Sequence, residues 1–140
     1  MKSVKELFSE QEIVAERARR VYVKISKDKL RDVVKKMVEL HDGQVYLSCI
    51  TGVDWIDRME VAYNIWVLPE SCNYTLKVDL PRDNPEITSI SDIIPGALFH
   101  ECEVYDLLGI VFKGNPILKK PFILPEGMKK EFPLRKDYKI

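Results

Sequence analysis

The stretch "QVYLSCITGVDWIDRMEVAYNIWVLPESCNYTLKVDL" at residues 44–80 decides the fold. It holds three apolar segments rich in β-branched and aromatic residues, at 44–54, 60–68 and 73–80, and polar turns separate them. The third segment alternates strictly, which places its apolar residues on one face of a strand: Tyr74, Leu76, Val78 and Leu80. Because the connections are short, we expect the three strands to pair antiparallel.

The sequence before this stretch adds a strand and two helices. Residues 20–25 alternate as a strand does, and residues 30–41 follow the i, i+3/i+4 rule of a helix, with Gly43 placed to end it. Ser3 and Glu6 form a capping-box pattern that predicts a helix through about Arg19. We therefore expect four strands near 20–25, 44–51, 60–68 and 73–80, with helices covering one side of the sheet.

The sequence after this stretch is rich in proline. Three prolines punctuate residues 81–97, where we expect a short helix near 89–93, and a longer helix from Pro95 should end at Gly109. Residues 115–140 contain four prolines and should form an extended, irregular tail. The sequence thus predicts an α+β fold with a mixed or antiparallel sheet, divided into an α+β domain (1–112) and an extended partner-docking tail (113–140).

The composition excludes several classes of protein. In 140 residues, Lys plus Arg (22) balances Asp plus Glu (22), which argues against broad electrostatic capture of nucleic acid or anionic lipid. The three cysteines lie far apart, so neither a disulfide framework nor a zinc ribbon is expected. The charged N-terminus predicts no signal peptide, and no apolar run has the length of a membrane span.

The densest cluster of reactive side chains is "HECEVYDLLGIVF" at 100–112. His100 and Glu103 are spaced i, i+3 with Cys102 nearby, yet no second His or Cys cluster completes the three or four ligands that a metal needs. His100 and Cys102 are spaced i, i+2 and do not face each other on a helix, which disfavours a nucleophile pair. The simplest interpretation is a half-buried acidic helix whose charges are satisfied by cations.

One source of cations is the C-terminal "PLRKD". Glu101, Glu103 and Asp106 lie too close together on one helix to go without cations, and Arg135 offers a planar fork that suits carboxylates. Either the tail folds back and places Arg135 within salt-bridge distance of one of these acids, or helix and tail both meet opposite charges on a partner.

The C-terminal motifs resemble a known family. "HECEVYDLLGIVFKGNPIL", then "FILP", then "FPLRKDY" follow the order seen in the thirty-kilodalton-subunit family of respiratory complex I, which has relatives in membrane-bound energy-converting hydrogenases. "ITGVD" (50–54), "NP" (84–85) and "SISDIIPGA" (89–97) are similar to the family as well. The matching residues that we take as candidates for partner docking are Glu101, Glu103, Asp106, Gly109, Phe112, Gly114, Pro116, Pro133, Leu134, Arg135, Lys136 and Asp137.

Three residues depart from the family pattern. Cys102 stands where Arg is usual, Phe99 where Trp is common, and Asn115 where His is usual. These departures favour a divergent archaeal-type or hydrogenase-type branch over the NADH-quinone branch.

The resemblance implies a non-catalytic peripheral-arm subunit of a complex I-like, membrane-bound, ion-translocating oxidoreductase, either hydrogenase-type or NADH dehydrogenase-like. Such a subunit docks on the large catalytic subunit and the small iron–sulfur subunit and helps to assemble them. The resemblance implies no catalytic, cofactor-binding or metal-binding residue in this chain, because iron–sulfur clusters, and nickel–iron in a hydrogenase, belong to the partners. It also implies a peripheral position on the cytoplasmic side of the cell membrane, with membrane contact only through partner subunits and no contact with nucleic acid.

Two alternatives remain open at the level of sequence. One is a stand-alone soluble binding module outside redox complexes, for instance one that uses Trp55, Trp66 and the Lys-rich tail on single-stranded nucleic acid. The other is a stand-alone enzyme that uses His100, Cys102 or Glu103.

Overall fold

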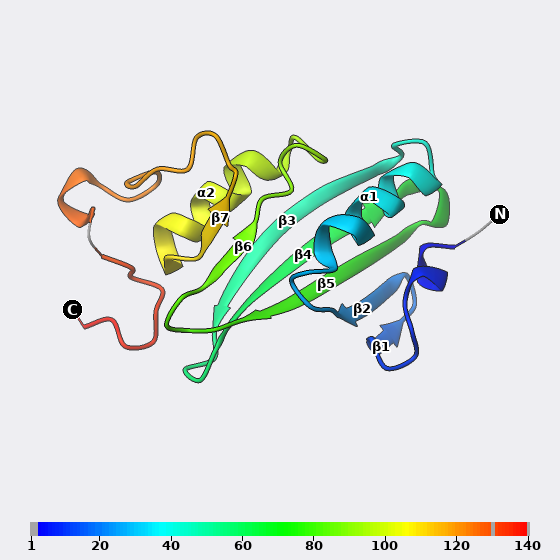
Figure 1. Ribbon diagram of the computed structural model, residues 1–140, viewed down its shortest axis with the longest axis horizontal. Coiled ribbons are helices and arrows are strands. Elements are labelled where there is room, and N and C mark those ends of the chain that lie inside the picture. Colours follow the sequence, from blue (N-terminus) through cyan, green and yellow to red (C-terminus); the bar gives the residue numbers. More distant parts are fainter. Residues whose placement is uncertain (1–2, 130, 140) are drawn as a thin grey trace.

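The computed structural model describes residues 3–129 and 131–139. In this part of the chain a five-stranded sheet has the order β1-β2-β5-β4-β3, and β6 and β7 form a separate two-stranded sheet (Figure 1). The elements are η1 (Val4–Leu7), β1 (Ile13–Arg17), β2 (Arg20–Lys24), α1 (Leu30–Leu40), β3 (Val45–Asp54), β4 (Met59–Val67), η2 (Leu68–Glu70), β5 (Cys72–Leu80), β6 (Glu86–Thr88), α2 (Ala97–Leu108), β7 (Val111–Lys113) and η3 (Glu126–Met128).

The strand pairing confirms the predicted α+β class. β3 pairs with β4, and β4 with β5, both antiparallel, as the short connections predicted. β2 lies beside β5 and runs parallel to it, so the sheet is mixed. The four strands expected from the sequence are all present, and β1 adds a fifth at the edge of the sheet.

The hydrophobic core lies on one face of this sheet. Alternate residues of β4 have no exposed surface, and buried residues of α1 and α2 belong to the same apolar cluster as Met59, Val61, Tyr63, Ile65 and Val67. Figure 1 shows α1 lying across the sheet and α2 beside β3. Among the described residues, neither helix has the length and continuous apolarity that crossing a membrane requires.

Gly52 of β3 allows α2 to pack closely on the sheet. A Cβ atom at this position would lie 2.5 Å from Leu108 Cδ1 and 2.9 Å from Val104 Cγ1. Non-bonded carbon atoms do not approach this closely, so a side chain here would force the Leu108 and Val104 side chains, or α2 itself, to shift. The absence of a side chain at Gly52 therefore permits close packing of β3 against the helix that carries the acidic cluster.

The predicted helix from Ser3 to Arg19 is wrong. Ser3 does accept a hydrogen bond from the Lys5 N–H at 3.2 Å, yet the helical segment is a short 3-10 turn that ends at Leu7. Residues 13–17 form β1, which pairs antiparallel with β2. Long-range pairing at the sheet edge thus outweighs the local capping signal.

The short helix predicted near 89–93 is also absent. This segment forms a turn, in which the Ile93 and Ile94 N–H groups donate to the Ile90 carbonyl oxygen at 3.0 and 2.9 Å. Just before this turn, β6 pairs parallel with β7, a strand that follows α2 in the sequence. By contrast, the helix predicted to end at Gly109 is confirmed as α2, because Gly109 adopts a left-handed conformation with φ of 78°.

Candidate docking site at the acidic helix and the C-terminal segment

Glu101 of α2 is a buried carboxylate that fastens two loops to the helix. It has no exposed surface and accepts hydrogen bonds from Ser89 Oγ (2.5 Å), the Ile90 N–H (3.0 Å) and Asn115 Nδ2 (2.9 Å). Burial raises the pKa of Glu101, and these three donors oppose the rise. All of its partners are structural, so this carboxylate holds residues 89–90 and 115 against α2.

Asp106, one and a half turns further along α2, holds the C-terminal segment (113–129 and 131–139) in the same way. Its Oδ2 accepts the N–H groups of Ile123 (2.7 Å) and Leu124 (2.9 Å). Lys120 Nζ lies 3.3 Å from Asp106 Oδ1 and 2.6 Å from the Asp106 carbonyl oxygen. Burial acts to raise the pKa of Asp106, but the backbone donors and Lys120 outweigh it and the net shift is downward.

Arg135 meets α2 by a route that the sequence did not indicate. Its Nε donates to the Leu108 carbonyl oxygen at 2.7 Å, and its guanidinium lies 4.8 Å from the centre of the Phe132 ring. No ion pair joins Arg135 to an acid among the described residues. The segment therefore does fold back on α2, but the salt bridge between Arg135 and an acid of this helix, the first of the two alternatives, is not formed.

Lys120 is the residue that sequence reasoning missed. It pairs with Asp106, and both side chains are buried, with 7% and 0% of their surface exposed. The Lys119–Lys120 pair directly before Pro121 was the available signal, but nothing local indicates that this lysine lies against an acid 14 positions earlier.

Asp54, at the end of β3, forms a second attachment point. Arg82 donates to its two oxygens at 3.1 and 2.9 Å, and the N–H groups of Ile56 and Lys136 donate at 2.8 Å each. The bonds from Arg82, added to by the two backbone donors, hold the pKa of Asp54 well below its usual range. Asp137 reaches the same Arg82 at 3.3 Å, so "ITGVD" and "LRKD" meet here.

The other candidate residues divide into core positions and surface positions. Phe112 is buried in β7, and Gly114 has a φ of 92°, which favours glycine. Exposed side chains include Glu103, Pro116, Leu134, Lys136 and Asp137, while Pro133 is half-buried. Glu103 has no ion-pair partner among the described residues. The structure thus brings Gly109 and Arg135 together, gives Glu101 and Asp106 separate sets of partners, and leaves Glu103 exposed.

The residues considered for reactivity are not arranged for it. Cys102 is buried with its Sγ 3.7 Å from the Ile117 carbonyl oxygen, and burial raises the pKa of its thiol. Within residues 3–129 and 131–139, no three His, Cys, Asp or Glu side chains converge as a metal site requires.

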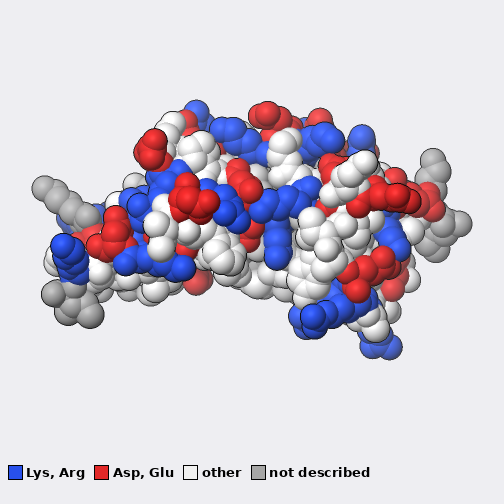
Figure 2. All heavy atoms as spheres, turned by 90° about the horizontal axis from the view of Figure 1, so that it is seen from below, with Lys and Arg blue, Asp and Glu red and all other residues white. Residues whose placement is uncertain are grey.

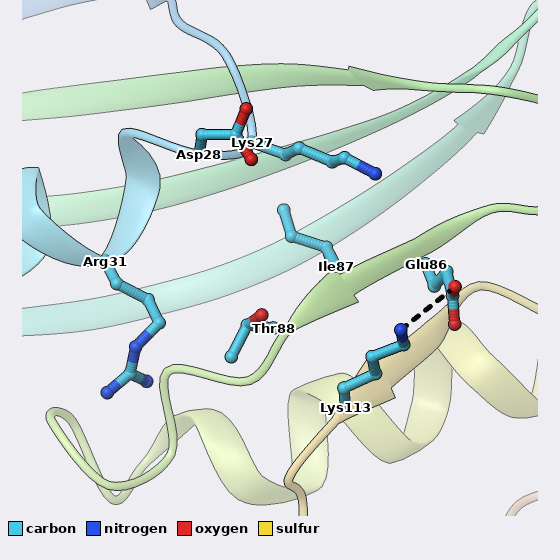
Figure 3. Close-up of a pocket in the computed structure, with 7 residues that line it drawn as sticks. All are labelled: Lys27, Asp28, Arg31, Glu86, Ile87, Thr88 and Lys113. Carbon is cyan, nitrogen blue, oxygen red and sulfur yellow. Dashed lines mark ion pairs between the residues drawn. The ribbon is translucent and has the colours of Figure 1, made fainter.

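A hollow of about 290 Å³ lies between the start of α1 and the β6–β7 pair (Figure 3). Lys113 pairs with Glu86 at 3.1 Å on the β6–β7 side of the hollow, and Arg31 pairs with Asp92 at 2.7 Å. Two of its three basic side chains are therefore already paired, and the hollow offers no converging set of groups for a ligand.

Comparison with known proteins identifies the family. Residues 23–140 match the family model described as respiratory-chain NADH dehydrogenase, 30 Kd subunit. The chain belongs to this family. The resemblance seen in the C-terminal motifs is therefore confirmed, and it extends over most of the chain.

Three relatives come from different oxidoreductases. A subunit of the F(420)H(2) dehydrogenase of Methanosarcina mazei is 40% identical over 113 residues, covering 77% of this chain and 71% of that protein. A subunit of the NADH-quinone oxidoreductase of Chloroherpeton thalassium is 39% identical over 97 residues, covering 68% of this chain but only 40% of that protein. The beta subunit of the membrane-bound hydrogenase of Pyrococcus furiosus is 31% identical over 146 residues, covering 97% of this chain and 82% of that protein.

A solved structure shares the fold. One chain in the structure of the membrane-bound sulfane sulfur reductase, an archaeal respiratory membrane complex, aligns with a TM-score of 0.82 and 28% identity. The alignment covers 92% of this chain and 77% of that one. These relatives are subunits of multi-subunit oxidoreductase complexes.

Proposed function

We propose that this chain is a non-catalytic peripheral-arm subunit of a complex I-like, membrane-bound, ion-translocating oxidoreductase. In this role it docks on the large catalytic subunit and the small iron–sulfur subunit and helps to assemble them. Family membership supports the proposal, and the hydrogenase and reductase relatives, which align over 97% and 92% of the chain, favour a hydrogenase- or reductase-type complex over an NADH dehydrogenase.

The observation that best supports the proposal is that the acidic residues of the family motifs accept structural hydrogen bonds. Asp54, Glu101 and Asp106 are buried, and each is occupied by hydrogen bonds that hold loops or the C-terminal segment in place. Acids engaged in this way hold a backbone rather than exchange protons with a substrate. The motif residues of α2 and of 133–137 therefore form one well-ordered surface, which we call the platform. Its exposed side chains include Glu103, Leu134 and Lys136, which a partner could contact.

We also propose that the chain holds no redox cofactor of its own. The half-buried Cys49 and Cys72 and the buried Cys102 lie in three different elements, β3, β5 and α2. Iron–sulfur clusters and nickel–iron are ligated mainly by groups of cysteines, so they would reside in the partner subunits. Contact with the membrane, on its cytoplasmic side, would likewise go through those partners.

The structure offers little support for a module that binds single-stranded nucleic acid. Trp55 is 45% exposed, but Arg58 and Lys136 lie 5.4 and 5.8 Å from its ring centre and occupy the ring that a base would stack on. Figure 2 shows basic and acidic side chains interspersed over one face of the molecule, which is not the single-sign groove that a nucleic-acid backbone requires.

Co-purification tests the proposal. The η1 turn lies at the opposite end of the molecule from the C-terminal segment, so an affinity tag at the N-terminus leaves the docking site clear (Figure 1). We expect the tagged chain to be recovered from detergent-solubilised membranes with one large and one small electron-transfer subunit. Recovery of the chain alone, at a detergent concentration that keeps those two subunits together, would refute the proposal.

A matched pair of variants locates the docking surface. Leu134 and Leu68 are both exposed, by 58% and 53%, and Leu68 lies in η2, outside the platform. Leu134→Asp should keep the fold and lose the partner subunits, whereas Leu68→Asp should retain both. Equal recovery of partners with both variants would show that the platform is not the docking surface.

A further inference from the structure

β3 is an edge strand with an unpaired side. It runs for ten residues and pairs only with β4 in the described chain. An exposed strand edge presents a row of N–H and C=O groups that can accept another strand, and proteins usually block such edges with charges or prolines. The sequence of β3, "VYLSCITGVD", contains neither a lysine, an arginine nor a proline.

The direction of the peptide groups follows from the hairpin that joins β3 to β4. The Trp55 N–H donates to the Arg58 carbonyl oxygen at 2.9 Å, and Thr51 and Val53 are opposite Ala62 and Glu60 in the same register. Hydrogen-bonded and non-bonded pairs alternate along an antiparallel ladder. Thr51 and Val53 therefore bond to β4, and the N–H and C=O groups of Ile50 and Gly52 point away from it.

A groove runs beside these outward-pointing peptide groups. It has a volume of about 130 Å³, and β3 and α2 form its two sides. Leu107 and Leu134 provide an apolar lining, Gly52 leaves the backbone uncovered, and Glu103 places an exposed carboxylate at the rim. The groove has the size of one aliphatic side chain and lies where the side chain of an added strand would point.

We propose that the β3 edge binds an extended segment of a neighbouring subunit, which joins the sheet as a sixth strand. The segment would place an aliphatic side chain in the groove and a lysine or arginine against Glu103. That the segment comes from another subunit of the complex rests on the proposed function. The backbone bonds provide affinity, and the groove and the carboxylate select the sequence.

The charge of the groove argues against a second copy of this chain as the occupant. In a symmetric pairing, β3 of one molecule would lie along β3 of the other, and β3 carries no basic residue to meet Glu103. A segment with basic residues satisfies both the backbone edge and the acidic rim.

Amide hydrogen exchange, resolved to single residues, tests this proposal on the full-length chain. In the isolated chain, Ile50 and Gly52 should exchange quickly, and their neighbours Thr51 and Val53 slowly. In the purified complex, Ile50 and Gly52 should slow by about tenfold or more because a partner strand now bonds to them. Thr51 and Val53, already bonded to β4, serve as internal controls that stay slow in both states.

The possible outcomes separate this proposal from the proposed function. If the chain co-purifies with its partners but Ile50 and Gly52 exchange as fast as in isolation, the edge is not a binding site, although the function stands. If analytical ultracentrifugation shows a dimer of the isolated chain with both amides already slow, the occupant is a second copy and the proposal is wrong.

A charge reversal tests the selection at the rim. Each tagged variant is expressed beside the untagged chain of the same strain, and the amount of partner subunit recovered with the tagged variant measures its association. Glu103→Lys should weaken the association by roughly three- to tenfold, the range expected for an exposed ion pair that becomes repulsive. Glu39→Lys on α1 makes the same charge change at another exposed acid and should leave the association unchanged. Equal effects of the two variants would contradict a basic residue at Glu103.

Discussion

Arg135 Nε donates a hydrogen bond of 2.7 Å to the carbonyl oxygen of Leu108, the last residue of α2. The last carbonyl groups of a helix have no partner within the helix and carry a partial negative charge, so a guanidinium is well matched to this position. The same guanidinium packs on Phe132, and a Cβ atom at Gly109 would lie 2.7 Å from Arg135 Nη2. Arg135, Phe132 and Gly109 therefore form one unit that ends the helix and anchors the C-terminal segment.

Arg135→Ala should reduce the free energy of unfolding by about 1.5–3 kcal/mol, the usual value of a hydrogen bond that involves a charged group. Urea denaturation followed by circular dichroism measures this loss. The exposed Arg17→Ala is the matched control and should change stability by less than about 0.5 kcal/mol. A loss no larger than that of the control would mean that the contact with Leu108 adds nothing to stability.

Asp106→Asn should reduce the free energy of unfolding by about 3 kcal/mol or more, because it leaves the buried Lys120 charge without its carboxylate partner. Asparagine keeps one acceptor oxygen, so its amide nitrogen must face either the N–H groups of Ile123 and Leu124 or the Lys120 ammonium group, all of which need an acceptor. Denaturant unfolding gives the value, and Glu103→Gln, at an exposed acid on the same helix, should be close to neutral. Adding Lys120→Met to Asp106→Asn should restore part of the stability; further destabilisation would argue against the pair as the cause.

Asp54 should make stability depend on pH in the acidic range. Its folded-state pKa lies below its ordinary value of 3.8, so the folded state holds this proton less tightly than the unfolded state. The stabilising contribution is thus present above about pH 4 and is lost as the pH falls below that value towards the folded-state pKa. Unfolding free energies at pH 7, 5 and 3 should show a smaller acid-side loss for Asp54→Asn than for the wild type. Parallel curves for the two proteins would contradict this role.

Gly52→Ala should destabilise the protein by about 1–3 kcal/mol, because the new methyl group overlaps Leu108 and Val104 of α2. Thermal unfolding measures the effect. Gly96→Ala is the control, since Gly96 has helical dihedral angles and no heavy atom lies within 4 Å of its built Cβ. The control should be neutral or slightly stabilising, and a similar loss in both variants would show that the contact with α2 is not the cause.

Much of the fold could be predicted from short stretches of sequence. The alternation in residues 73–80 identifies β5, the helical period of 30–41 identifies α1, and Gly109 marks the end of α2. The motifs at 100–116 and 133–137 indicated the family, and the family match confirms that resemblance. These features are local, since each depends on residues within a few positions of one another.

The tertiary structure alone decided the rest. Residues 13–17 form a strand because they pair with β2. β6 forms because it pairs with β7, which follows α2 in the sequence. Lys120 rather than Arg135 meets Asp106, and the Lys136 N–H reaches Asp54 across 82 positions of sequence. Such contacts depend on which distant segments the packed core brings together. The stabilisation from a buried ion pair or from an edge strand depends on the distant partner, so it leaves no periodic pattern in the local sequence.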